Sequence, residues 1–144
     1  MKMRFAMAVL LIAAVPLGAA PVPKELRKPA LAGMWEITGS NVWANETSDY
    51  NGQHWRFAPD GGFTSADPKP GGGHQPPRTH GSYQIVPEGV DVKFGGAGVA
   101  AALGRFDFHE GRLRLAFANR NDVRPADLNP ASGSVIYTFK RVGE

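Results

Sequence analysis

From Gly33 onward, apolar and polar residues alternate with a period of two, a pattern typical of strands with one buried and one solvated face. The clearest example is a hairpin over 105–117, in which the turn Glu110-Gly111 separates strands at 105–109 and 112–117. One face of this predicted hairpin holds five large apolar side chains: Phe106, Phe108, Leu113, Leu115 and Phe117. Charged residues occupy the intervening positions, so we expect the opposite face to be solvated.

The same alternation predicts six further strands, at 34–38, 54–58, 63–65, 82–86, 90–94 and 134–141. All the connections between them are compatible with antiparallel neighbours. An open sheet would expose its apolar face and both edges, whereas closure removes the edges. We therefore predict an all-β fold, a small antiparallel eight-stranded meander barrel, with a two-sheet sandwich as the alternative.

The composition supports this fold, because 18 glycines and 12 prolines among 144 residues favour short strands and turns over long helices. Many of these residues lie in hairpin turns and in three long connections, at 66–80, 95–103 and 120–133. Loops positioned by a rigid scaffold commonly hold binding residues. We therefore expect any binding site to lie near these connections.

The first 20 residues follow a different pattern, in which Lys2 and Arg4 precede an apolar run over 5–15 and then small residues up to Ala20. This order predicts a secretory signal peptide over 1–20, cleaved after Ala19 or Ala20. The run is too short to span a bilayer, and an uncleaved anchor is the alternative. We expect an exported protein, periplasmic or extracellular, with a polar leader at 21–30, one domain at 31–144 and no membrane span after cleavage.

Cleavage would change the charge of the protein. The chain has 16 basic and 13 acidic residues and a pI of about 9.4. Because the leading segment holds two basic residues, Lys2 and Arg4, and no acidic one, 14 basic residues would remain against the same 13 acidic ones. A nearly neutral protein does not attract a phosphate backbone, so we expect no nucleic-acid partner. The absence of cysteine excludes disulfides, thiolate metal sites and a cysteine nucleophile.

Two short motifs, Gly33-Met34-Trp35 and Lys140-Arg141, are similar to the two ends of a lipocalin-type barrel. In that family a Gly-x-Trp opens the first strand, and a basic side chain of the last strand packs over the indole. The resemblance therefore implies structural roles for Gly33, Trp35 and Arg141, with a cation over an aromatic face at the base of the barrel.

A longer resemblance extends over roughly 31–141. The chain resembles a lipocalin-like family of uncharacterised bacterial proteins that is expanded in planctomycetes. The motifs that carry the likeness are Leu31-Ala32-Gly33-Met34-Trp35, the hairpin 104–115, Arg124-Pro125 and the final strand 135–141. That family has no established activity, so the resemblance implies a lipocalin-like fold and leaves the function open.

The histidines give little indication of a metal site. His74 and His80 are six residues apart in a predicted loop, without the spacing that places two imidazoles on one ion. A site formed by these two and Asp67 is the alternative to solvated loop histidines. His54 and His109 fall on predicted polar faces of strands. We predict neither a metal nor a cofactor.

Catalysis also lacks a clear motif. The chain has no Gly-x-Ser-x-Gly sequence, the signature of a nucleophile elbow. Asp91 and Asp107 could approach each other across strands, but surface pairing with Lys93 and Arg105 explains them. We predict that the protein is not an enzyme and rank a hydrolase with a loop-borne site last.

Two groups of residues are candidates for ligand binding. Arg124 precedes Pro125, which fixes the backbone, so its guanidinium either clamps a loop carbonyl or carboxylate or receives an anionic ligand at the barrel mouth. Trp43, Trp55 and Tyr50 form an aromatic cluster that would either line the same opening or cap the core.

The preferred prediction is a secreted, non-enzymatic lipocalin-like protein that binds a small apolar or amphipathic ligand, if it binds one. The alternative is an envelope protein-interaction module without a small-molecule ligand. A cavity of about 300 Å³ or more would favour the first, whereas a filled barrel with an exposed apolar patch would favour the second.

Overall fold

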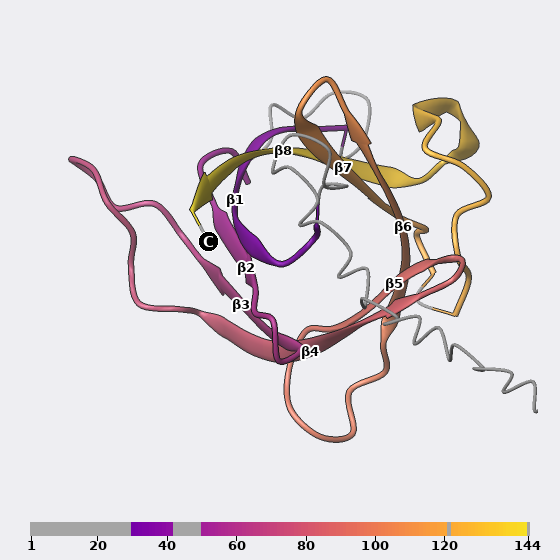
Figure 1. Cartoon of the computed structure of the whole chain (residues 1–144), viewed down its shortest axis with the longest axis horizontal. Helices are drawn as coiled ribbons and strands as arrows, with labels where there is room; N and C mark the ends of the chain where they lie inside the picture. Colours follow the sequence, from indigo (N-terminus) through magenta and orange to yellow (C-terminus); the bar gives the residue numbers. More distant parts are fainter. Residues whose placement is uncertain (1–29, 42–49, 121, 144) are drawn as a thin grey trace, which may run out of the picture.

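The computed structural model describes residues 30–41, 50–120 and 122–143. In this part of the chain, eight antiparallel strands close into a barrel in sequence order (Figure 1). The strands are β1 (Gly33–Ser40), β2 (His54–Phe57), β3 (Gly62–Ala66), β4 (Thr79–Val86), β5 (Gly89–Lys93), β6 (Ala102–His109), β7 (Arg112–Phe117) and β8 (Val135–Gly143). The predicted meander barrel is thus confirmed, and the sandwich is not formed.

The inward positions of the strands form one aromatic and aliphatic core, as their alternation predicts. Phe139 of β8 faces Ile37 on one neighbouring strand and Leu113 on the other, and all three side chains are buried. Similar pairs continue around the wall, for example Phe57 opposite Phe63. Each fully buried side chain of this size contributes about 1.5–3 kcal/mol relative to an exposed one, so this core is the main source of stability.

The connections divide the barrel into two unlike ends. Three short turns, at 58–61, 87–88 and 110–111, lie at one end, which we call the closed end. The strand ends that the four longer connections join, at 41–53, 67–78, 94–101 and 118–134, lie at the other, which we call the open end. The segment 67–78 projects away from the barrel wall between β3 and β4 (Figure 1).

Trp35 closes the base of the barrel at the closed end. Its indole nitrogen donates a hydrogen bond to the carbonyl of Leu31 at 2.8 Å, and both side chains are buried. The guanidinium carbon of Arg141 lies 5.1 Å from the centroid of the Trp35 ring. A cation at this distance over an indole stabilises the pair by about 0.5–1 kcal/mol at an exposed site.

Gly33 makes this arrangement possible for two reasons. Its φ of 141° is one that side chains rarely adopt, and a Cβ at this position would lie 2.6 Å from Nη2 of Arg141. That nitrogen donates to the carbonyl of Ala32 at 2.5 Å. The guanidinium therefore keeps its position over the indole only because residue 33 has no side chain.

The predicted signal peptide lies outside the described residues, as does the predicted leader apart from Ala30. Among the residues that are described, helical structure is limited to the 3-10 turn Pro130–Ser132. That part of the chain contains no helix with the length and apolarity needed to cross a membrane.

Candidate functional site

A pocket of about 580 Å³ lies at the open end of the barrel. Its apolar lining consists of Trp55, Phe94, Ala102, Phe117, Ala118, Val135 and Tyr137. Its polar lining includes Tyr50, Gln53, Ser65, Arg78, Thr79 and Asn119. The pocket thus combines an aromatic surface with neutral polar groups and one cation.

Small inward residues at the open end leave this space. Ser65 of β3 faces Thr79 of β4 across the strands, and Ala102 of β6 is the first inward residue of its strand. One step toward the closed end, the neighbour of Ser65 on the inward face is Phe63, which is fully buried. The width available to a ligand is therefore set by side-chain size at these few positions, and large side chains fill the space below them.

Trp55 is the centre of the aromatic lining. Its ring centroid lies 5.6 Å from that of Phe94 and 5.3 Å from that of Tyr137, distances typical of stabilising aromatic pairs. Its indole nitrogen donates to the side-chain oxygen of Gln53 at 3.2 Å. Trp55 is 5% exposed, so the packing fixes the position of the indole before any ligand arrives.

Tyr137 adds a hydroxyl to the same surface. Burial, together with the nearby phenol of Tyr50, raises the pKa of Tyr137 to about 12, so the hydroxyl stays protonated at neutral pH. The two tyrosine rings meet edge to face, 5.8 Å apart. Tyr137 lines the pocket, so its protonated hydroxyl can donate a hydrogen bond to a bound molecule.

Arg78 is the one charged side chain among the described residues that line the pocket. It is 77% exposed, and its Nη1 lies 3.3 Å from Oδ2 of Asp67. The other oxygen of Asp67 accepts a hydrogen bond of 2.7 Å from Gln53, which also holds Trp55. A chain of polar contacts therefore links Arg78 at the rim to the aromatic lining.

The structure separates the four predicted ligand-binding residues. Trp55 and Tyr50 line the pocket, whereas Trp43 lies outside the described residues. Arg124 is not part of the lining. Its guanidinium donates to the backbone carbonyls of Val90 at 3.4 Å and of Gly104, and to Asp91 at 2.5 Å.

These contacts have the geometry of the clamp that the sequence left as one of two options for Arg124. The connection containing it lies along the outside of β5 and β6, where Pro125 is buried and its carbonyl accepts a hydrogen bond of 2.9 Å from Arg105. Asp91 thus pairs with Arg124 rather than with Lys93. Similarly, Asp107 pairs with Arg114 rather than with Arg105.

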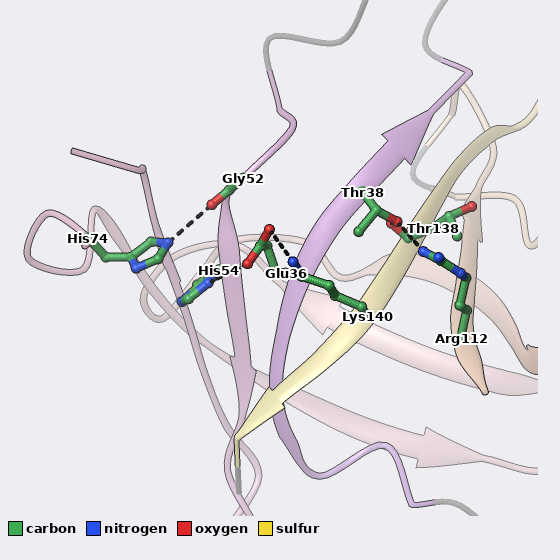
Figure 2. A network of polar contacts seen from close by, with 8 residues as sticks. All are labelled: Glu36, Thr38, Gly52, His54, His74, Arg112, Thr138 and Lys140. Carbon is green, nitrogen blue, oxygen red and sulfur yellow. Dashed lines mark hydrogen bonds and ion pairs between the residues drawn. The ribbon is translucent and has the colours of Figure 1, made fainter. Parts of the chain in front are cut away.

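A second polar cluster lies on the outer face of the barrel, where β1, β2 and β8 adjoin (Figure 2). The imidazoles of His54 and His74 are stacked with centroids 3.2 Å apart, and His74 contacts the carbonyl of Gly52 at 3.1 Å. Glu36 lies between His54, at 3.3 Å, and Lys140, at 3.0 Å. The cluster ties the segment 67–78 to the wall of the barrel.

Burial shifts the acid–base balance of this cluster. The pKa of His54 is lowered, first by desolvation and also by the neighbouring His74, although the hydrogen bond to Glu36 opposes the shift. The pKa of Glu36 is lowered chiefly by its contact with Lys140. At neutral pH we therefore expect a neutral His54 beside an ionised Glu36.

The metal site considered for His74, His80 and Asp67 is not assembled. His80 lies within β4, opposite Thr64, rather than in the preceding connection, and His74 stacks on His54 instead. Asp67 contacts Gln53 and Arg78. Among the residues that the structure describes, no group of three or more histidine, aspartate or glutamate side chains could hold a metal ion.

Sequence reasoning missed several lining residues. The alternation places Phe117 on an apolar face, Tyr137 within the last predicted strand and Phe94 at a strand end, but it identifies none of them as part of a pocket. Their positions next to long connections were the available signal. For Arg78, which lies in a Gly- and Pro-rich connection, the sequence contained no comparable signal.

Comparison with known proteins adds no assignment. No protein-family model matches the chain, and no curated protein matches it. The class defined by the structure is an eight-stranded antiparallel meander barrel, a fold compatible with a lipocalin-like ligand-binding domain.

Proposed function

We propose that this chain is an exported, non-enzymatic, lipocalin-like protein that binds a small apolar or amphipathic molecule at the open end of its barrel. The pocket of about 580 Å³ is the observation that supports the proposal. It exceeds the ~300 Å³ at which ligand sites begin and lies within their usual range.

The chemistry of the lining supports the same function. Trp55 and Phe117 are buried, and Phe94 and Tyr50 are partly exposed at the mouth. Such a surface gains free energy by covering its apolar area with an apolar ligand, at about 25 cal/mol per Å² removed from water. The hydroxyls of Ser65, Thr79 and Tyr137 supply orientation without a charge.

Native mass spectrometry of the mature protein, purified gently from its own host, tests the proposal. We expect a fraction of the protein to carry one additional small-molecule mass. In the variant Ser65→Phe the new ring points into the pocket, so that mass should be lost. Ser82→Phe is the matched control, because Ser82 is exposed on the outside of β4.

Two results would contradict ligand binding at the open end of the barrel. The first is a protein without any additional mass that repeatedly co-purifies with one protein partner, which would favour the alternative of an envelope interaction module. The second is a small-molecule mass that persists in Ser65→Phe, which would place the ligand elsewhere on the molecule.

A further inference from the structure

The charge of the pocket lining bears on the chemical class of its ligand. Every described lining residue other than Arg78 is neutral, and no carboxylate lines the described part of the pocket. An anionic group at the rim would therefore meet one cation in the lining, whose partner carboxylate, Asp67, lies outside the lining. A cationic group at the rim would be repelled by the same guanidinium and would find no carboxylate in the described lining.

Arg78 retains most of its hydrogen-bonding capacity. A guanidinium has five N–H donors in a planar fork that matches a carboxylate. The contact with Asp67 uses one nitrogen at 3.3 Å, and the side chain is 77% exposed. Asp67, held in turn by Gln53 at 2.7 Å, can orient Arg78 and still leave donors for a ligand.

The other half of the ligand faces rings. The ring centroids of Phe94 and Tyr137 lie 5.6 Å and 5.3 Å from that of Trp55. Aromatic groups stack on such surfaces or meet them edge to face, and each such pair is stabilising beyond the area that it buries. The lining therefore suits a planar ring system.

We propose that the ligand is a ring-containing organic acid, with its rings among Trp55, Phe94 and Tyr137 and its single anionic group at Arg78. This inference rests on the proposed function and specifies its ligand class. One acidic group is expected rather than two, because a second would enter the apolar part of the pocket without a counter-charge.

Two fluorescent probes with the same ring system test the inference. N-phenyl-1-naphthylamine is neutral, and 1-anilinonaphthalene-8-sulfonate has one sulfonate. We expect both to bind the intact protein and both to be lost in Ser65→Phe. The variant Arg78→Gln should weaken sulfonate binding by about threefold to tenfold, the range of an exposed charge-assisted hydrogen bond, and leave the neutral probe unchanged.

Arg120→Gln is the matched control. Arg120 is also an exposed, ion-paired arginine of an open-end connection, 75% exposed and 2.8 Å from Asp122, but it does not line the pocket. This variant should bind both probes as the parent does.

The outcomes distinguish a failure of the proposed function from a failure of the inferred ligand class. If Ser65→Phe weakens the binding of neither probe, the proposed function is contradicted, and so is the organic acid as its ligand class. The neutral probe could instead bind the parent and be lost in Ser65→Phe, while Arg78→Gln weakens sulfonate binding no more than Arg120→Gln does. That result would contradict an organic acid as the ligand class but support a ligand site at the open end.

Discussion

The two ends of the barrel contain the same kinds of side chain in different arrangements. At the closed end, the indole of Trp35 is fixed by the carbonyl of Leu31 and covered by Arg141. At the open end, the indole of Trp55 is fixed by Gln53, and the space next to it is a pocket rather than a plug. The comparison indicates that the residues next to an aromatic side chain decide whether it serves the core or faces a ligand.

The largest expected effect is at the closed end. Trp35→Ala removes a buried indole and its hydrogen bond, so we expect a loss of about 3–5 kcal/mol in the free energy of unfolding. Tyr50→Ala at the open end, where the ring is 39% exposed, should cost less than about 1 kcal/mol. Urea denaturation measures both. Equal losses would abolish the distinction between the ends.

A second test concerns the contact between Gly33 and Arg141. Gly33→Ala should lower the free energy of unfolding by about 1–3 kcal/mol, because a Cβ meets both a positive φ and the guanidinium. Combining it with Arg141→Ala relieves the clash but not the backbone strain, so the double variant should be more stable than the sum of the single effects indicates. Strict additivity would show that the two residues do not interact.

A third test compares the space at the two levels of the barrel. Val92→Phe places a larger side chain in the filled core, where Val92 is fully buried, and should cost about 1–3 kcal/mol. Ser65→Phe extends into the pocket and should cost less than about 1 kcal/mol, since no packed neighbour must move. Thermal denaturation of both variants measures the difference. A larger loss for Ser65→Phe would mean that the pocket is not open space.

The smallest expected effect concerns pH. Because the pKa of His54 is lowered in the folded protein from its ordinary value of 6.5, the unfolded chain takes up the proton first as pH falls. The contribution of His54 to stability is therefore complete above pH 6.5 and decreases below it. The pKa of Glu36 is lowered from 4.5, so the contribution of Glu36 to stability is complete above pH 4.5 and decreases only below it.

Urea midpoints at pH 8 and pH 5.5, measured for the parent and for His54→Gln, test the contribution of His54, and Glu36 stays ionised at both pH values. We expect the midpoint to decrease toward pH 5.5 and this decrease to be smaller in His54→Gln. If the variant has the same pH profile as the parent, His54 does not contribute to it.

The fold was predictable because strand alternation is a local property. Alternation places Phe139, Ile37 and Leu113 on inward faces, and the turns and register shifts of the structure then set which of them lie opposite one another. The contact between Trp35 and Arg141 was expected from a resemblance rather than from the pattern itself.

The site was only partly predictable, because it depends on distant contacts. His54 and His74 are 20 residues apart, and their stacking depends on the path of the segment 67–78, which has no strand pattern. Arg124 reaches residues 20 and 34 positions away, so the neighbouring proline alone could not decide between clamp and ligand site. Tyr50 and Trp55 were identified as aromatic candidates, but the small residues that create the pocket have no signature in a single sequence.

The indole N–H signals of Trp35 and Trp55 in a ¹H–¹⁵N correlation spectrum test the difference between the two ends most directly. After assignment with Trp→Phe variants, the spectrum is followed as N-phenyl-1-naphthylamine is added. We predict that the Trp55 signal shifts in a saturable way while the Trp35 signal stays in place. Equal shifts of both signals, or a shift of Trp35 alone, would contradict a ligand site at the open end.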